Sequence, residues 1–548
     1  MKAEFDAMVR DNQMTKVLLG MDDYTFVKTE KDIYADCRGT QEKVLLEMLK
    51  ANADTEYGRK YNFAGIKSVE EYQAKVPVTD WEDYIEYSQR MQRGEENVTF
   101  PGKATFFYRT SGTTSSYKLI PESVRERVSR GMISRGRITE MILHLGPEVQ
   151  ERVFAFFNKS ALDMTEGGIP YGTASGRSSE NTSPDMVKKL TYPPQLVNEF
   201  EGDELKYMML RFSLCYDNVS AILGNNALML RTLIDFGKAH AEDLINDIRR
   251  GVSKYPVSEK LKAAVGDLMD PDPDRADELE KLYKEDKFIP KYYWKKLRAA
   301  AFWLGGSVGV YVKNIKNLLP DTTQYYDVGY GASEGKINIP ILPGTPAGVL
   351  ATMCNFYEFI PEEGGAPITA DKLEQGKNYD LIITNNAGLY RYDLKDLIHV
   401  DSFTGNTPNI YFLSKLADVA NLAQEKIPGV MLIEAITDIM REEKIEFKMA
   451  QVFPDPETQS YIVCLEPSDE SAINAENYEA LKEKLDSGLR SRLIQYDTYR
   501  GKLLNKTGLA VMKTGWADEM IKKYTRGNAT SAQVKVPVVA NKMPVIVS

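Results

Sequence analysis

The sequence predicts an α/β protein with a large N-terminal domain, in which helices flank mixed sheets, and a small α+β C-terminal domain. Apolar, aromatic-rich runs of strand length lie at residues 104–109 and 153–157, bounded by turn residues. Further runs alternate with glycine-containing turns from Gly305 onward, as in sheets that end in ligand-binding loops. After about Ala417 short helical and extended patterns alternate. We therefore expect one domain over residues 1–415 and another over 416–548.

The individual elements follow from hydrophobic periodicity and turn residues. Residues 1–100 read as helical, with Val44, Leu45, Met48 and Leu49 on one face. A helix is expected over 228–248, where Arg249-Arg250-Gly251 provides a cationic last turn and a glycine stop. The acidic stretch 270–285 contains two prolines, which favours a loop and a solvated helix start over a metal site.

The remaining elements are expected as strands beginning at Gly305, Thr323 and Tyr379 in the large domain. In the small domain we expect two helices and three strands. The helices are placed at 430–442 and 478–493, and the strands at 446–453, 461–466 and 509–513.

Composition and charge narrow the class of protein. A hydrophobic share of 43% with 27% charged residues is ordinary for a folded globular chain. The net charge of −10 argues against non-specific binding of nucleic acid, so no nucleic-acid partner is expected. The four cysteines form no CxxC pair, which favours a reducing compartment and gives no zinc-ligand spacing.

No membrane association is expected. The N-terminal residues lack the apolar core of a signal peptide. The uncharged run from Ala299 to Val312 is shorter than the roughly 20 residues that span a bilayer. These features predict a cytoplasmic protein with no membrane partner.

The first segment with a chemical signature is Thr110–Lys118, TSGTTSSYK, directly after a predicted strand. A glycine among hydroxyl residues gives a mobile turn that is rich in N–H and O–H donors, and the lysine adds a positive charge. These groups suit a polyphosphate. The spacing differs from the GxxxxGK[ST] phosphate loop, and composition alone favours a surface Ser/Thr turn.

Two further segments carry carboxylates. Gly329–Gly335, GYGASEG, places Glu334 in a glycine-flanked loop, where a carboxylate can bind Mg²⁺ or act as a helix cap. Tyr390–Asp396, YRYDLKD, ends in an aspartate that could accept ribose hydroxyls or belong to a surface ion cluster.

The order of these segments is that of adenylate-forming enzymes, and Thr110–Lys118 resembles their TSGTTGxPK loop, with Ser115 and Tyr117 in place of a glycine and a proline. Further segments narrow the match: NADTEYGRKYNF from Asn52, VPVTDWEDY, GYGASEG, YRYDLKD and AQVKVP from Ala532. Together they resemble the auxin-responsive promoter (Gretchen Hagen) family of acyl acid–amido synthetases along nearly the whole chain.

The resemblance implies a role for particular residues. The phosphates of ATP would be held by Ser111, Gly112, Thr113, Thr114 and Lys118. Glu334 would bind Mg²⁺, and Asp396 would bind the ribose. Tyr330 and Ser333 would line the nucleotide site, with Gly306-Ser307 against the adenine.

The resemblance also implies a mobile C-terminal domain. Lys415 and Asp418 lie where related enzymes hinge, and Lys415 would contact the nucleotide. Lys535 would be the mobile catalytic lysine, although an exposed tail lysine is the simpler alternative. Lys395 stands where the family's YRxxxGD motif has glycine, and Asp393 where arginine is frequent, so the shape of that loop is open.

The implied activity is a ligase that adenylates a small carboxylic acid and transfers the acyl group to an amino acid. One alternative is an acyl-CoA ligase, which shares the adenylation step; the absence of the PKTxSGKxxR pattern disfavours it. Another is a binding protein that senses ATP or a small acid without turnover. Two phosphate lysines on separate domains, Lys118 and Lys535, argue for catalysis. The sequence identifies neither the acid nor the amine, nor the base that deprotonates the amine.

Overall fold

The computed structural model describes residues 34–110, 118–179, 184–415, 418–420, 422–423, 425, 427–524, 536–540 and 543. The chain divides into two compact units. The first comprises Met1–Leu304, Tyr311–Leu394 and His399–Tyr411, and the second Gly305–Val310, Lys395–Ile398 and Phe412–Ser548. The expected boundary between residues 415 and 416 stays a prediction.

Short helices begin the described part of the first unit. In α4 (Cys37–Ala51) the Asp36 side chain accepts a hydrogen bond from the backbone N–H of Gly39, which caps the helix. Leu45, Met48 and Leu49 are buried on one face, as their spacing predicts. The helices that follow are α5 (Glu56–Lys60), α6 (Val69–Lys75) and α7 (Ile85–Gln92).

The first sheet has the order β2-β1-β5-β4. Its strands are β1 (Phe106–Arg109), β2 (Leu119–Glu122), β4 (Asp163–Met164) and β5 (Pro170–Gly172). β1 and β2 are antiparallel, with Arg109 opposite Leu119, so the hydroxyl-rich segment connects the two strands of a hairpin. The aromatic run at 104–109 is a buried strand, as predicted.

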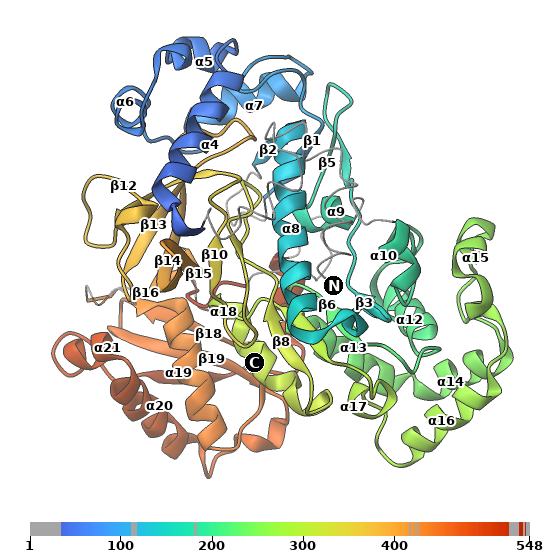
Figure 1. Cartoon of the computed structure of the whole chain (residues 1–548). Helices are drawn as coiled ribbons and strands as arrows, with labels where there is room; N and C mark the ends of the chain where they lie inside the picture. The colour runs from blue at the N-terminus through green and yellow to red at the C-terminus, as the bar shows by residue number, and fades with distance from the viewer. Residues whose placement is uncertain are drawn as a thin grey trace. The chain divides into compact units, whose positions relative to one another are not determined.

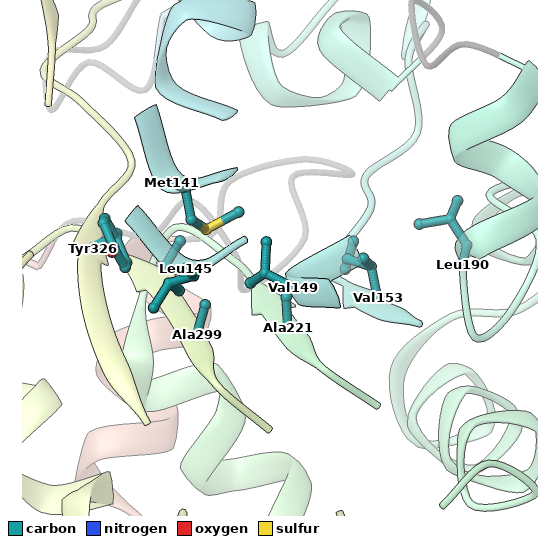
Figure 2. Packing of buried hydrophobic residues seen from close by; sticks show 10 residues of the cluster. Met141, Leu145, Val149, Val153, Leu190, Ala221, Ala299 and Tyr326 are labelled. Carbon is teal, nitrogen blue, oxygen red and sulfur yellow. The ribbon is translucent and has the colours of Figure 1, made fainter. Parts of the chain in front are cut away.

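The second sheet is entirely parallel, in the order β3-β6-β7-β8. Its strands are β3 (Val153–Ala155), β6 (Ala221–Leu223), β7 (Ala299–Phe302) and β8 (Gln324–Asp327). The long helix α8 (Val124–Leu145) packs on it: Figure 2 shows Met141 and Leu145 beside Ala299 and Tyr326.

Helices connect the strands of the second sheet (Figure 1). The expected helix over 228–248 is two helices, α13 (Ala227–Ala239) and α14 (Ala241–Arg250), which meet at His240. Gly251 ends α14 with a φ of 64°, as the glycine stop predicts. The other helices are α9 (Ala174–Ser179), α10 (Pro184–Lys189), α11 (Leu196–Glu199), α12 (Gly202–Ser213), α15 (Glu259–Val265), α16 (Pro273–Lys284) and α17 (Pro290–Tyr293).

The strand expected from Gly305 is wrong. The chain forms α18 (Gly306–Gly309) and then a 3-10 helix over Val310–Leu318. Tyr311, Val312, Ile315 and Leu319 are buried, and this spacing is helical rather than alternating. The strand that the apolar run does contain is β7, which ends at Phe302.

The third sheet has seven strands in the order β12-β11-β13-β14-β15-β10-β9. The β11–β13, β11–β12, β10–β15 and β10–β9 pairs are antiparallel. The strands are β9 (Asn338–Ile339), β10 (Gly348–Leu350), β11 (Phe356–Pro361), β12 (Ile368–Thr369), β13 (Asn378–Thr384), β14 (Tyr392–Thr404) and β15 (Thr407–Lys415).

The second unit contains a small α+β core. A three-stranded sheet in the order β18-β19-β20 packs with two long helices, as the sequence predicts. The strands are β18 (Phe447–Asp455), β19 (Ser460–Pro467) and β20 (Gly508–Val511), with the pair β16 (Val419–Ala420) and β17 (Ile427–Pro428) before them. The helices are α19 (Gly429–Glu442), α20 (Tyr478–Arg492), α21 (Ile494–Tyr499) and α22 (Trp516–Tyr524).

The helices of the described residues are too short or too polar to cross a bilayer.

Candidate active site

The β1–β2 hairpin holds the two ends of the hydroxyl-rich segment together. The backbone N–H of Thr110 donates to the carbonyl of Lys118 at 3.1 Å, and the N–H of Lys118 donates to Thr110 Oγ1 at 3.1 Å. Ser111, Gly112, Thr113 and Thr114 lie outside the described residues. Their phosphate-binding role stays a prediction.

Lys118 is half-buried among aromatic side chains. Its Nζ lies 3.2 Å from the hydroxyl of Tyr392 and 5.8 Å from the ring centre of Trp81. Tyr392 is the third residue of the YRYDLKD motif. The fold therefore brings the first and third sequence motifs into contact within one unit.

The GYGASEG loop leaves the end of β8. One oxygen of the Asp327 carboxylate accepts from the N–H of Gly329 at 2.5 Å, and the other accepts from the N–H of Leu304 at 2.7 Å. The N–H of Tyr330 donates to Asn338 Oδ1 at 2.7 Å. Gly329 has a φ of 83°, a left-handed conformation that glycine adopts freely. The turn after β8 therefore needs both the aspartate and the glycine.

Ser333 ties this loop to the first sheet. Its hydroxyl donates to the carbonyl of Arg109 at 3.4 Å, at the end of β1. Arg130 of α8 donates to the carbonyl of Ser333 at 2.6 Å and forms an ion pair with Glu126 at 2.7 Å. The sequence predicts a site role for Lys118 and for Ser333 but none for Arg130.

Glu334 is 8% exposed. Its carbonyl accepts from Asn385 Nδ2 at 2.6 Å, which fixes the backbone. Among the described residues no side chain or N–H donates to its carboxylate. A buried carboxylate without a protein donor fits a role as a cation ligand. No group of three or more His, Cys, Asp or Glu side chains that could hold a metal exists among the described residues.

The YRYDLKD motif begins with a buried ion pair. Arg391 makes two hydrogen bonds to the Glu358 carboxylate, both at 2.9 Å, and its φ of 46° is left-handed. This bidentate pair is a structural anchor that the sequence does not reveal. Asp393 donates its backbone N–H to the Thr79 carbonyl at 2.9 Å.

Asp396 and Lys415 form an ion pair within the second unit. Asp396 is buried, whereas the Lys415 side chain is half exposed. The two residues expected to contact the nucleotide are thus brought together. Lys395, which replaces the glycine of the family motif, has a φ of 55°, so the backbone keeps the conformation that a glycine would adopt.

Gly306 begins α18, also in the second unit. Its φ is 64°, and a Cβ added there would lie 3.1 Å from Phe412 Cδ1. The glycine therefore lets the backbone approach an aromatic ring. Ser307 lies in α18, but its side chain is outside the described atoms, so its contact with adenine stays a prediction.

Lys535 lies outside the described residues. The residues after it, Val536–Ala540, run along β18: the N–H of Val452 donates to the Val538 carbonyl at 2.7 Å, and the N–H of Ala540 donates to the Val452 carbonyl at 2.8 Å. Asp418 accepts the N–H of Val539 at 2.8 Å, and burial raises the pKa of its carboxyl. The expected hinge residue thus contacts the segment that follows Lys535.

Two domain models of one protein family match this chain. The GH3 family N-terminal domain matches residues 28–324, and the GH3 family central domain matches residues 348–415. The chain belongs to the GH3 family. The resemblance of its motifs to this family is confirmed.

Individual GH3 relatives are similar along most of their length. A jasmonoyl–L-amino acid synthetase (JAR4) of Nicotiana attenuata is 24% identical over 541 residues, covering 92% of this chain and 91% of its own. The 4-substituted benzoates–glutamate ligase GH3.12 of Arabidopsis thaliana is 24% identical over 547 residues, covering 94% of each chain.

Solved structures share the fold. The acyl acid amido synthetase AtGH3.15, in complex with 2,4-DB, superposes with a TM-score of 0.83 at 20% identity, covering 94% of each chain. A 2-hydroxyisobutyryl-CoA ligase in a postadenylation state gives a TM-score of 0.52 at 12% identity, covering 94% of this chain and 90% of its own. The α/β fold expected from the sequence is therefore that of GH3 and adenylate-forming enzymes.

Proposed function

We propose that this GH3 protein is an acid–amino acid ligase. It activates a small carboxylic acid with ATP as an acyl-adenylate, transfers the acyl group to the amine of an amino acid, and releases AMP and pyrophosphate. The observation that carries the proposal is the meeting of the motifs: Ser333 contacts the end of β1, where the hydroxyl-rich loop begins, and Lys118 at the end of that loop contacts Tyr392. The relatives named as amino acid synthetases support the acceptor class.

In the first half-reaction the carboxylate attacks the α-phosphorus in line and pyrophosphate leaves. Lys118, with the donors of Ser111, Gly112, Thr113 and Thr114, neutralises the charge that builds on the leaving group. Lys535 adds a second positive charge in this step. Mg²⁺, when bound at Glu334, supplies further charge neutralisation on the phosphate oxygens.

Other residues bind the nucleoside. Asp396 accepts hydrogen bonds from the ribose, and the ion pair with Lys415 keeps its carboxylate oriented. Tyr330 and Ser333 line the nucleotide site, and Gly306-Ser307 lie against the adenine. In the second half-reaction the deprotonated amine attacks the acyl carbon, an amide forms, and AMP leaves.

An acyl-CoA ligase is the alternative with the same first step. Product identification separates the two. Purified protein is incubated with ATP, MgCl₂, a panel of aromatic, indolic and short aliphatic acids, and either mixed amino acids or CoA. The proposal expects an amide by mass spectrometry and no thioester; a thioester without any amide overturns it. A protein that binds ATP without releasing pyrophosphate would instead be a sensor.

A cytoplasmic location is part of the proposal. The four cysteines, all among the described residues, form no disulfide, and this supports a reducing compartment. We propose no membrane or nucleic-acid partner; the net charge of −10 supports the latter.

A further inference from the structure

One arginine of α8 donates to two consecutive carbonyls of the GYGASEG loop. Nη2 of Arg130 lies 2.6 Å from the carbonyl oxygen of Ser333, and Nη1 lies 3.4 Å from that of Ala332. The third nitrogen, Nε, lies 2.7 Å from Oε1 of Glu126, one helical turn earlier. All three nitrogens of the guanidinium are therefore engaged, and all these contacts lie within the first unit.

The β1–β2 hairpin encloses the same guanidinium from another side. Its central carbon lies 4.1 Å from the ring centre of Tyr108 in β1. The Tyr108 hydroxyl donates to the buried carboxylate of Glu122 in β2, which also pairs with Arg177 at 2.8 Å. Two arginines and two glutamates balance in charge within this cluster. Arg130 is therefore held against the loop by the protein alone.

The contacts of Arg130 set the direction of two peptide groups. In a trans peptide the C=O and N–H bonds point to opposite sides of the chain. Because the carbonyls of Ala332 and Ser333 face Arg130, the N–H groups of Ser333 and Glu334 face away from it. Neither N–H donates to another group of the described residues. Arg130 thus orients two available donors and the backbone from which the Glu334 carboxylate extends.

The other contacts of the loop are made by neutral groups. Asn385 Nδ2 donates to the Glu334 carbonyl at 2.6 Å, and the Ser333 hydroxyl donates to the Arg109 carbonyl at 3.4 Å. Hydrogen bonds from an ionised donor are stronger than those between neutral groups. Among these contacts, the bond from Arg130 to the Ser333 carbonyl should therefore contribute most to holding the loop in place.

Resting on the function proposed above, we propose that Arg130 is a positioning residue for adenylation. It holds the backbone of Ser333 and Glu334 in the orientation from which these residues reach the nucleotide and its metal ion. Glu126 and the Tyr108 ring keep the guanidinium against the loop. Arg130 acts through the loop and takes no part in bond formation.

The first test is acid-dependent pyrophosphate exchange by Arg130→Lys. Lysine keeps the charge, but its single ammonium cannot replace the planar fork that serves Glu126 and both carbonyls. We expect kcat to fall about tenfold or more, because a displaced loop misplaces the groups that it carries. The KM for ATP should change by a smaller factor, and the Mg²⁺ concentration that gives the half-maximal rate should rise.

Arg275→Lys is the matched control. Arg275 is 6% exposed, as Arg130 is, and it also pairs with a glutamate of its own helix, Glu278. It donates to three backbone carbonyls, none of them in the three sequence motifs. Its replacement should lower the temperature of thermal unfolding without changing kcat. An equal loss of kcat in Arg275→Lys would reduce Arg130 to a structural arginine and overturn the proposal.

A double variant tests the proposal if Arg130→Lys does not fold. Arg130→Met combined with Glu126→Leu removes both charges of the pair, and apolar replacement of a buried ion pair is often neutral for stability. The folded double variant should show the same fall in kcat. A wild-type kcat and Mg²⁺ dependence in either folded variant would overturn the positioning role.

Amide hydrogen exchange of residues 329–336, measured without any ligand, gives a readout that is independent of turnover. It should be faster in Arg130→Lys than in the wild type and unchanged in Arg275→Lys. Unchanged exchange of this loop in Arg130→Lys would also overturn the proposal. If the wild-type protein showed no pyrophosphate exchange with any acid, the proposed function would fail instead, and the hydrogen exchange would still test the contact of Arg130 with the loop.

Discussion

The Nζ of Lys118 lies 3.2 Å from the hydroxyl of Tyr392. The contact joins the end of the hydroxyl-rich hairpin to the first residue of β14, across a sequence separation of 274 residues. The lysine is thereby held near the aromatic side chains of Trp81 and Tyr392 rather than extended into solvent. Under the proposed function, a cation held in this way would lose little side-chain entropy when it binds phosphate.

Lys118→Ala should slow adenylation by about a hundredfold while leaving the fold intact, because one preorganised charge contact to the phosphates is lost. Tyr392→Phe keeps the charge of Lys118 and removes the hydroxyl that contacts Nζ, so it should cost much less. Pyrophosphate exchange measures both, and thermal unfolding followed by circular dichroism checks the fold. Wild-type exchange in a folded Lys118→Ala protein would remove this loop from the site.

Glu334→Gln should slow adenylation to a similar degree, because the amide keeps the shape of the side chain but binds a hard cation poorly. The Mg²⁺ concentration that gives the half-maximal rate should then be higher than in the wild type. Glu363→Gln changes an exposed carboxylate and serves as the control. An unchanged Mg²⁺ dependence in Glu334→Gln would contradict the metal-ligand role.

Several elements were predictable because one local signal dominates. The strand at 106–109 is flanked by turn residues on both sides, and Gly251 ends α14 in the conformation that a glycine stop requires. Two elements were not. The break between α13 and α14 at His240 interrupts an apolar periodicity that continues along the sequence. The apolar run at 305–312 fits both a strand and a helix pattern, and only the burial of Ile315 and Leu319 in the structure shows that it is helical.

Some residues of the candidate site could be predicted from the sequence and others could not. Lys118, Ser333 and Glu334 were predictable because they lie in motifs. Arg130 was not, because only the packing of α8 against the loop brings it to Ser333. The loop around Lys395 could not be predicted either, because a lysine stands where the family motif has glycine. Its φ of 55° is set by the surrounding tertiary structure, since lysine itself disfavours the left-handed conformation.

Asp396→Ala should chiefly raise the KM for ATP, with a smaller change in kcat, since a ribose contact is equally strong in the ground and transition states. Titration of ATP in the exchange assay measures both constants. Lys415→Ala, which removes the partner of the ion pair, should raise the same KM by a smaller factor. If Asp396→Ala left the KM unchanged, the ribose role would pass to Asp393.

Lys535→Ala should abolish most adenylate formation but spare amide formation from a chemically prepared acyl-adenylate. A lysine on a mobile domain can serve one half-reaction and then withdraw. General destabilisation cannot produce this split, because it would lower both rates together. Parallel loss of both rates, or no change in either, would make Lys535 an exposed tail lysine.

The central claim is that this GH3 protein forms an acyl-adenylate. The most direct test is exchange of labelled pyrophosphate into ATP by the full-length wild-type protein, with Mg²⁺ and an acid but without any amine. We expect exchange that requires the acid and proceeds without an amino acid, because adenylation is a separate, reversible first step. Exchange that no acid in the panel supports, or that begins only when an amino acid is added, would contradict it.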